Sequence, residues 1–121
     1  RLQCERDLKA KLINLHQGYI SCSGKGRGLR ALLLEAYPGF FPLFRAMLPI
    51  VRPDRTPSLL KASVLADIEA GFGITMEPLR EIRALGKKRT FGLDWNIPKR
   101  IFTELYRITH ELSLAADNLS S

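Results

Sequence analysis

Apolar side chains recur at helical spacing along almost the whole chain. Near the start they fall at Leu8, Leu12, Leu15 and Tyr19, a series that predicts a helix over about Leu2 to Ile20. The cleanest series lies near the other end, where five apolar residues form one stripe: Ile97, Ile101, Leu105, Ile108 and Leu112. No segment of convincing length alternates apolar and polar residues as a half-buried strand does. The pattern therefore predicts an all-α domain.

Glycine and proline divide this pattern into a bundle of about six helices. The glycines between Ser21 and Gly28 predict a loop, and Pro38-Gly39 predicts the end of a second helix that begins at Leu29. A third helix is expected over Phe40 to Val51, where Pro49 would close or kink it. A fourth helix is predicted from Pro57 to Ala70, with Thr56 as its N-cap and Gly71 as a left-handed C-terminal cap. A fifth helix should run from a Thr75 cap to about Lys88. The last helix should open at Asn96 or Ile97 with Pro98 in its first turn, and residues 113–121 are expected to be a frayed tail.

The length fits a single domain, residues 1–121, with one hydrophobic core. The chain begins at Arg1 without a methionine and enters a helical pattern at once, so we expect a piece of a longer protein. Charges interrupt every apolar run before it reaches the roughly 20 residues of a spanning helix. We therefore expect no membrane partner. Cys4 and Cys22 could pair, but only two cysteines without a C-x-x-C spacing favour reduced thiols, so we expect a cytoplasmic protein.

The charge balance is the feature of the composition that departs most from the average. Nineteen Lys and Arg residues outnumber twelve Asp and Glu residues, which gives a net charge of +7. Such a balance favours anionic partners, although solvated helix faces can account for it as well. One stretch concentrates the charge and has Phe91 and Trp95 close by as stacking surfaces; its basic residues are Arg80, Arg83, Lys87, Lys88 and Arg89. It predicts one function, a non-enzymatic module that binds nucleic acid or protein.

A second function follows from a motif. The sequence Ser63-Val-Leu-Ala-Asp67-Ile-Glu-Ala-Gly71 resembles the S-x-L-x-D-x-x-A-G signature in the C-terminal helical domain of the ketopantoate reductase (2-dehydropantoate 2-reductase) family. Gly92-Leu-Asp-Trp-Asn-Ile-Pro98 resembles the family's G-V-x-x-P element enlarged by two residues. Lys11-Leu-Ile-Asn14 is one residue shorter than the family's Lys-x-x-x-Asn pair.

The resemblance implies a fold like the C-terminal domain of 6-phosphogluconate dehydrogenase. It makes Lys11 the general acid, Ser63, Asn14 and Glu77 the substrate-binding residues, and Asp67, Gly71 and Thr75 structural residues. Thr75 stands where the family has its active-site glutamate, so the chain diverges at that acid. Each residue also has a plain structural alternative: Ser63 can bond its own helix backbone, Thr75 can be only a cap, and Lys11 and Asn14 can be surface residues.

For an intact protein the resemblance implies NADPH-dependent reduction of a small 2-keto acid, with a Rossmann domain preceding this chain and a possible homodimer. The chain itself has no Gly-x-Gly-x-x-Gly unit between a strand and a helix, so we expect it to bind no cofactor and to catalyse nothing alone. The glycine-rich stretch around Lys25 lacks the spacing of a phosphate loop. His16 and His110 lie far apart without zinc-type neighbours, so we expect no metal site.

Overall fold

The computed structural model describes residues 2–54, 56, 60–88 and 92–120, with the side chains of residues 2, 119 and 120 left out. Every regular element in these ranges is helical, which confirms the all-α class. The elements are α1 (Leu2–Ser21), α2 (Gly26–Ala36), the 3₁₀ turn η1 (Tyr37–Gly39), α3 (Phe40–Val51), α4 (Lys61–Phe72), α5 (Glu77–Lys87) and α6 (Asn96–Ser120).

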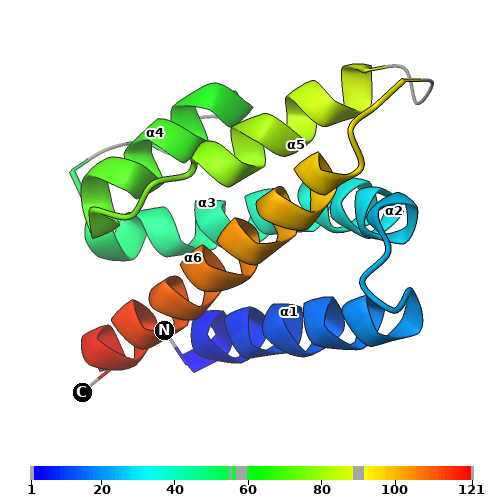
Figure 1. Cartoon of the computed structure of the whole chain (residues 1–121). Coiled ribbons are helices and arrows are strands. Elements are labelled where there is room, and N and C mark those ends of the chain that lie inside the picture. Colours follow the sequence, from blue (N-terminus) through cyan, green and yellow to red (C-terminus); the bar gives the residue numbers. More distant parts are fainter. Residues whose placement is uncertain (1, 55, 57–59, 89–91, 121) are drawn as a thin grey trace.

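The helices pack as a bundle that α6 crosses from end to end. α6 packs on α1, α2 and α5, and in Figure 1 it runs obliquely over the other helices. α3 packs against α4 on one side and contacts α1 on the other, so that α3 separates α1 from α4 (Figure 1). α5 packs on α2 and η1. This order decides which side chains of the chain can share a site.

The apolar stripes of the sequence meet in one core. All but the first residue of the predicted α6 stripe are buried, and so is the predicted stripe of α5 at Leu79, Ile82 and Leu85. The aromatic centre of the core comes from α3, where Phe40, Phe41 and Phe44 are buried. Fully burying a side chain of this size contributes about 1.5–3 kcal/mol, so the core outweighs any single surface contact.

The middle of the chain differs from the prediction of separate helices. Pro38 and Gly39 do not end the second helix, because η1 joins α2 to α3 without a non-helical residue. The described residues therefore form five unbroken helical segments, and the expected number of about six is not confirmed. Proline fits at this junction because the 3₁₀ turn starts a new helical stretch, where an N–H is not needed for pairing.

The joined segment Gly26–Val51 is long and apolar enough to cross a membrane by length and composition alone, contrary to the sequence expectation that no run reaches that length. Core helices and signal sequences pass the same test. In this fold six large apolar side chains of its second half are buried in the core: Phe40, Phe41, Leu43, Phe44, Met47 and Leu48.

Three other predicted boundaries are wrong. α2 begins at Gly26, three residues before Leu29, and its first glycines are required by packing: a Cβ would lie 2.4 Å from the Trp95 carbonyl oxygen at Gly26 and 2.3 Å from the Cys22 Cβ at Gly28. α4 begins at Lys61 with Leu60 as its N-cap, so Thr56 is not the cap; the predicted first turn at residues 57–59 lies outside the described residues. The expected frayed tail is instead the last part of α6, which continues to Ser120 and buries Ser113 and Ala116.

Candidate functional site

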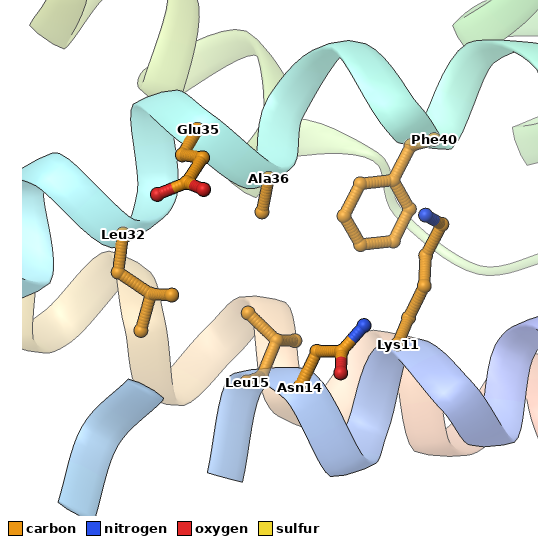
Figure 2. A pocket seen from close by; sticks show the side chains of 7 residues that line it. All are labelled: Lys11, Asn14, Leu15, Leu32, Glu35, Ala36 and Phe40. Carbon is orange, nitrogen blue, oxygen red and sulfur yellow. The ribbon is translucent and has the colours of Figure 1, made fainter. Parts of the chain in front are cut away.

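A hollow with a volume of about 300 Å³ lies between α1 and the α2–η1–α3 segment. α1 supplies Lys11 and Asn14 to its wall, and α2 supplies Glu35. Figure 2 shows the Lys11 and Asn14 side chains at one end of the hollow and the Glu35 carboxylate toward the other. The remaining wall is apolar and consists of Leu15, Leu32, Ala36 and Phe40.

Lys11 is the most perturbed cation in this region. Its ammonium nitrogen lies 5.0 Å from the centroid of the Phe40 ring, a cation–π contact. Burial lowers the pKa of Lys11, because removing water penalises the charged form, while the nearby Asp7 carboxylate partly raises it. Gly39 approaches so closely that a Cβ at that position would lie 3.0 Å from the Lys11 nitrogen. The ammonium is thus held between an aromatic ring and the backbone of η1.

A second hollow of about 280 Å³ shares Lys11 and Asn14 with the first. Its other walls come from Asp7 on α1 and from Gly39 and the first turns of α3. The two residues therefore border both hollows. They are three positions apart on α1, which places them on one face of the helix.

The hollow combines an amine of lowered pKa, a carboxamide and a carboxylate above an apolar floor. Lysine offers three N–H donors, asparagine both a donor and an acceptor, and an ionised glutamate only acceptors. Such a wall suits a short molecule with an acidic group at one end and a hydrogen-bond donor at the other. Within the described part of the chain, no group of three or more His, Cys, Asp or Glu residues is placed to hold a metal ion.

Lys11 and Asn14 were candidate site residues from the sequence, whereas Glu35 was not. In α2 the spacing of the apolar residues places Leu29 and Leu33 on the buried side of the helix. This spacing shows only that Glu35 is not a core residue. Its place opposite Lys11 results from the packing of α1 on α2, which no local pattern encodes. No signal in the sequence therefore links the two charges.

Ser63, the central residue of the signature, lies apart from this hollow. It is half-buried on α4, and α4 is on the far side of α3 from α1 (Figure 1). Neither of the two hollows that contain Lys11 and Asn14 includes Ser63 among its walls. Asp67 is buried on the same helix. These two hollows thus bring Lys11 and Asn14 together without Ser63.

The end of the signature forms a tight turn between α4 and α5. Gly71 is inside α4 and is not the predicted left-handed cap; that role belongs to Gly73, with φ 68° and ψ 24°. Gly71 is instead required by packing, because a Cβ there would lie 2.8 Å from a methyl carbon of Val51. The Thr75 hydroxyl accepts a hydrogen bond from the Glu77 N–H at 3.2 Å, so Thr75 helps to start α5 although Met76 is the N-cap.

Glu69, which the sequence analysis did not single out, holds this turn together. Its carboxylate accepts two hydrogen bonds from the Arg80 guanidinium, one of them at 2.9 Å, and another from the Met76 N–H at 2.8 Å. The hydrogen bond from Arg80 is the main reason that the pKa of Glu69 is lowered, and the Thr75 hydroxyl acts in the same direction. Glu77 is exposed and reaches Arg80 at 3.3 Å. Thr75 and Glu77 therefore belong to a structural ion-pair cluster.

The predicted basic stretch is only partly available to a ligand. Arg80 is taken up by Glu69 and Glu77, whereas Arg83, Lys87 and Lys88 are exposed. Arg89 and Phe91 lie outside the described residues. Trp95 is half-buried, with the Arg27 guanidinium carbon 4.9 Å from its ring centroid.

No known family model, curated protein or solved structure matches this chain.

Proposed function

We propose that this chain is a ligand-binding helical domain that holds a small 2-keto acid in the hollow of Lys11 and Asn14. The observation that carries the proposal is the half-buried Lys11 ammonium on the wall of that hollow, beside Asn14. The carboxylate and the keto oxygen of a 2-keto acid are neighbours, so one ammonium with three donors can bond both. Asn14 adds a further donor, and Glu35 faces a hydroxyl or other donor group at the opposite end of the ligand.

The proposal draws on the resemblance to ketopantoate reductases and assigns this binding role to one domain of a longer protein. In that setting a preceding Rossmann domain holds NADPH, this domain closes the substrate pocket, and the 2-keto acid is reduced to a 2-hydroxy acid. A lysine of lowered pKa releases its proton more readily to a developing alkoxide, as a general acid must. A fold of the 6-phosphogluconate dehydrogenase C-terminal type, a homodimer and a cytoplasmic location belong to the same proposal. The proposed binding site lies at Lys11 and Asn14 and does not include Ser63, so it differs from a site built on the signature.

The test is calorimetric titration of the chain with pyruvate as the probe 2-keto acid and propionate as the carboxylate that lacks the keto group. Pyruvate is expected to bind more tightly than propionate. Lys11→Met should weaken pyruvate binding by about 10- to 100-fold, since a hydrogen bond to a charged group contributes about 1.5–3 kcal/mol. The matched control is Lys9→Met on the same helix. The Lys9 side chain is exposed, and its ammonium nitrogen lies 3.8 Å from a carboxylate oxygen of Asp117. Lys9→Met should leave binding unchanged.

Ser63→Ala decides between the hollow and the signature. If the ligand lies beside Lys11, Ser63→Ala leaves the affinity for pyruvate unchanged. A loss with Ser63→Ala but not with Lys11→Met would move the site to α4 and overturn the proposal. Equal affinity for pyruvate in the wild-type, Lys11→Met and Lys9→Met proteins, or no binding at all, would contradict it as well.

A further inference from the structure

Cations, all exposed except the half-buried Arg30, gather where α2 and α5 run side by side. The two helices pack so closely that a Cβ at Gly86 would lie 3.0 Å from a methyl carbon of Leu34. The positive charge of Arg83 also acts on the Tyr37 hydroxyl, at the end of α2. Five cations follow this line of contact, and we call them the basic band: Arg27 and Arg30 on α2, Arg83 and Lys87 on α5, and Lys88 directly after it.

The basic band is short of negative charge in the part of the chain that the structure describes. Within the described residues none of its five side chains is in an ion pair. The acids of the same two helices point elsewhere: Glu35 borders the Lys11 hollow, Glu81 binds Arg100, and Glu77 binds Arg80. The buried Nε of Arg30 has no hydrogen-bond partner either. Five like charges without counter-charges repel one another, and an anionic ligand relieves that repulsion.

Aromatic rings lie at both ends of the band. At one end the Arg27 guanidinium covers the Trp95 ring, and Trp95 is anchored beside Gly26, where a Cβ would lie 2.4 Å from the Trp95 carbonyl oxygen. At the other end the Lys61 ammonium lies 5.2 Å from the centroid of the Tyr37 ring. Surfaces that bind single-stranded nucleic acid commonly combine cations, which contact the phosphates, with aromatic rings, which stack on the bases.

We propose that the basic band, together with Trp95, binds single-stranded nucleic acid. An anionic membrane is the other large polyanion, but a membrane-binding surface sets large apolar side chains beside its cations. Four of the five exposed large apolar residues of the described chain lie on α1 and α6: Ile13, Tyr19, Ile20 and Leu114. The fifth, Leu60, lies at the Tyr37 end of the band, where it lines a hollow with Lys61 and Arg83. The surface therefore offers five cations and aromatic rings but only one large exposed apolar side chain, Leu60, among the described residues. It is separate from the Lys11 hollow, which opens on the α1 side of α2.

The experiment is fluorescence anisotropy with a labelled single-stranded oligonucleotide at several salt concentrations. If about four phosphates are neutralised, the affinity should fall roughly 50-fold between 50 and 200 mM salt, from a logarithmic slope of about 0.7 per phosphate. The double variant Lys87→Gln/Lys88→Gln should bind more weakly and lower the slope by about 1.4. The matched control removes the same charge from α1 as Arg6→Gln/Lys9→Gln and should leave both quantities unchanged.

Trp95→Leu separates stacking from charge. It should weaken binding about tenfold and leave the salt slope unchanged, since stacking involves no phosphate. Because Trp95 also packs on α2, Arg27→Gln serves as a second variant that leaves the ring in place; it should lower the slope by about 0.7. The proposal is overturned if no oligonucleotide binds at 50 mM salt or if the α1 control weakens binding as much as the band variant. It is overturned equally if phosphatidylserine vesicles bind and oligonucleotides do not.

Discussion

At the scale of single residues, Lys11 shows how tertiary packing changes a side chain that the sequence identifies only by type. Its position three residues before Asn14 is visible in the sequence, and this spacing predicts that both lie on one face of α1. Its lowered pKa is not visible, because it results from the burial of the ammonium against Phe40 and η1. The chemistry of the hollow depends on this second property.

Lys11→Met is therefore expected to stabilise the fold near neutral pH. A lysine whose pKa is lower in the folded than in the unfolded state binds fewer protons when folded. The wild-type free energy of unfolding consequently rises as the pH increases from the folded pKa to the unfolded value of about 10.4. The gain from Lys11→Met should be below about 1 kcal/mol at pH 7, since the side chain keeps solvent contact, and should shrink toward pH 10. Urea unfolding of the wild-type and Lys11→Met proteins at pH 7, 9 and 10 measures this gain in the free energy of unfolding. Lys9→Met serves as the control, because Lys9 is exposed. A gain from Lys11→Met that does not change with pH would refute the explanation.

At the scale of the elements, hydrophobic spacing predicted the helices well, and the turn residues predicted their ends poorly. α3 has the predicted bounds, and α1 differs by one residue. Gly71 and Gly73 are equally good cap candidates in the sequence, and the choice of Gly73 follows from the contact of Gly71 with Val51 on α3. Likewise Pro38-Gly39 is a strong stop signal, yet η1 carries the chain on into α3. A contact with a distant segment settled the first of these boundaries, so local chemistry was insufficient there.

The turn between α4 and α5 should depend on Glu69. Its pKa is lowered in the fold, so the ion pair with Arg80 contributes stability above the unfolded pKa of about 4.3, and this contribution is lost as the pH falls through the lower folded value. Glu69→Gln should cost about 1 kcal/mol at pH 7, after allowing for partial solvent exposure. Thermal unfolding at pH 7 and pH 3 should show the cost shrinking in acid.

The control for that variant is Glu111→Gln. Glu111 pairs with Arg107 at 2.7 Å on the exposed surface of α6, one turn away on the same helix. Such pairs contribute about 0.2–0.5 kcal/mol, so the control should cost less than Glu69→Gln. Equal costs for the two variants, or a Glu69→Gln cost that persists at pH 3, would show that Glu69 does not hold the turn.

At the scale of the whole molecule, α2 separates two surfaces of different character. Leu32 and Glu35 face the Lys11 hollow beside α1, whereas Arg27 and Arg30 join the cations of α5. The net charge and the basic residues were readable from the sequence, but their division between the two sides of α2 was not. The same holds for Ser63, whose distance from Lys11 results from the position of α3 between their helices (Figure 1).

The C-terminal end tests the whole bundle, because the sequence predicts a frayed tail where the structure has a packed helix. Ser113 and Ala116 are buried, and Asp117 lies 3.8 Å from Lys9 of α1, so residues 113–118 cover the first half of α1. Deleting residues 113–121 should therefore lower the melting temperature by roughly 5 °C or more, as a loss of about 1 kcal/mol does in a domain of this size. Deleting only residues 119–121 is the matched control and should change it by no more than about 1 °C. Calorimetry of both truncated proteins decides between the two descriptions: if the longer deletion melts like the full chain, the end of α6 contributes nothing to the core and the frayed tail is correct.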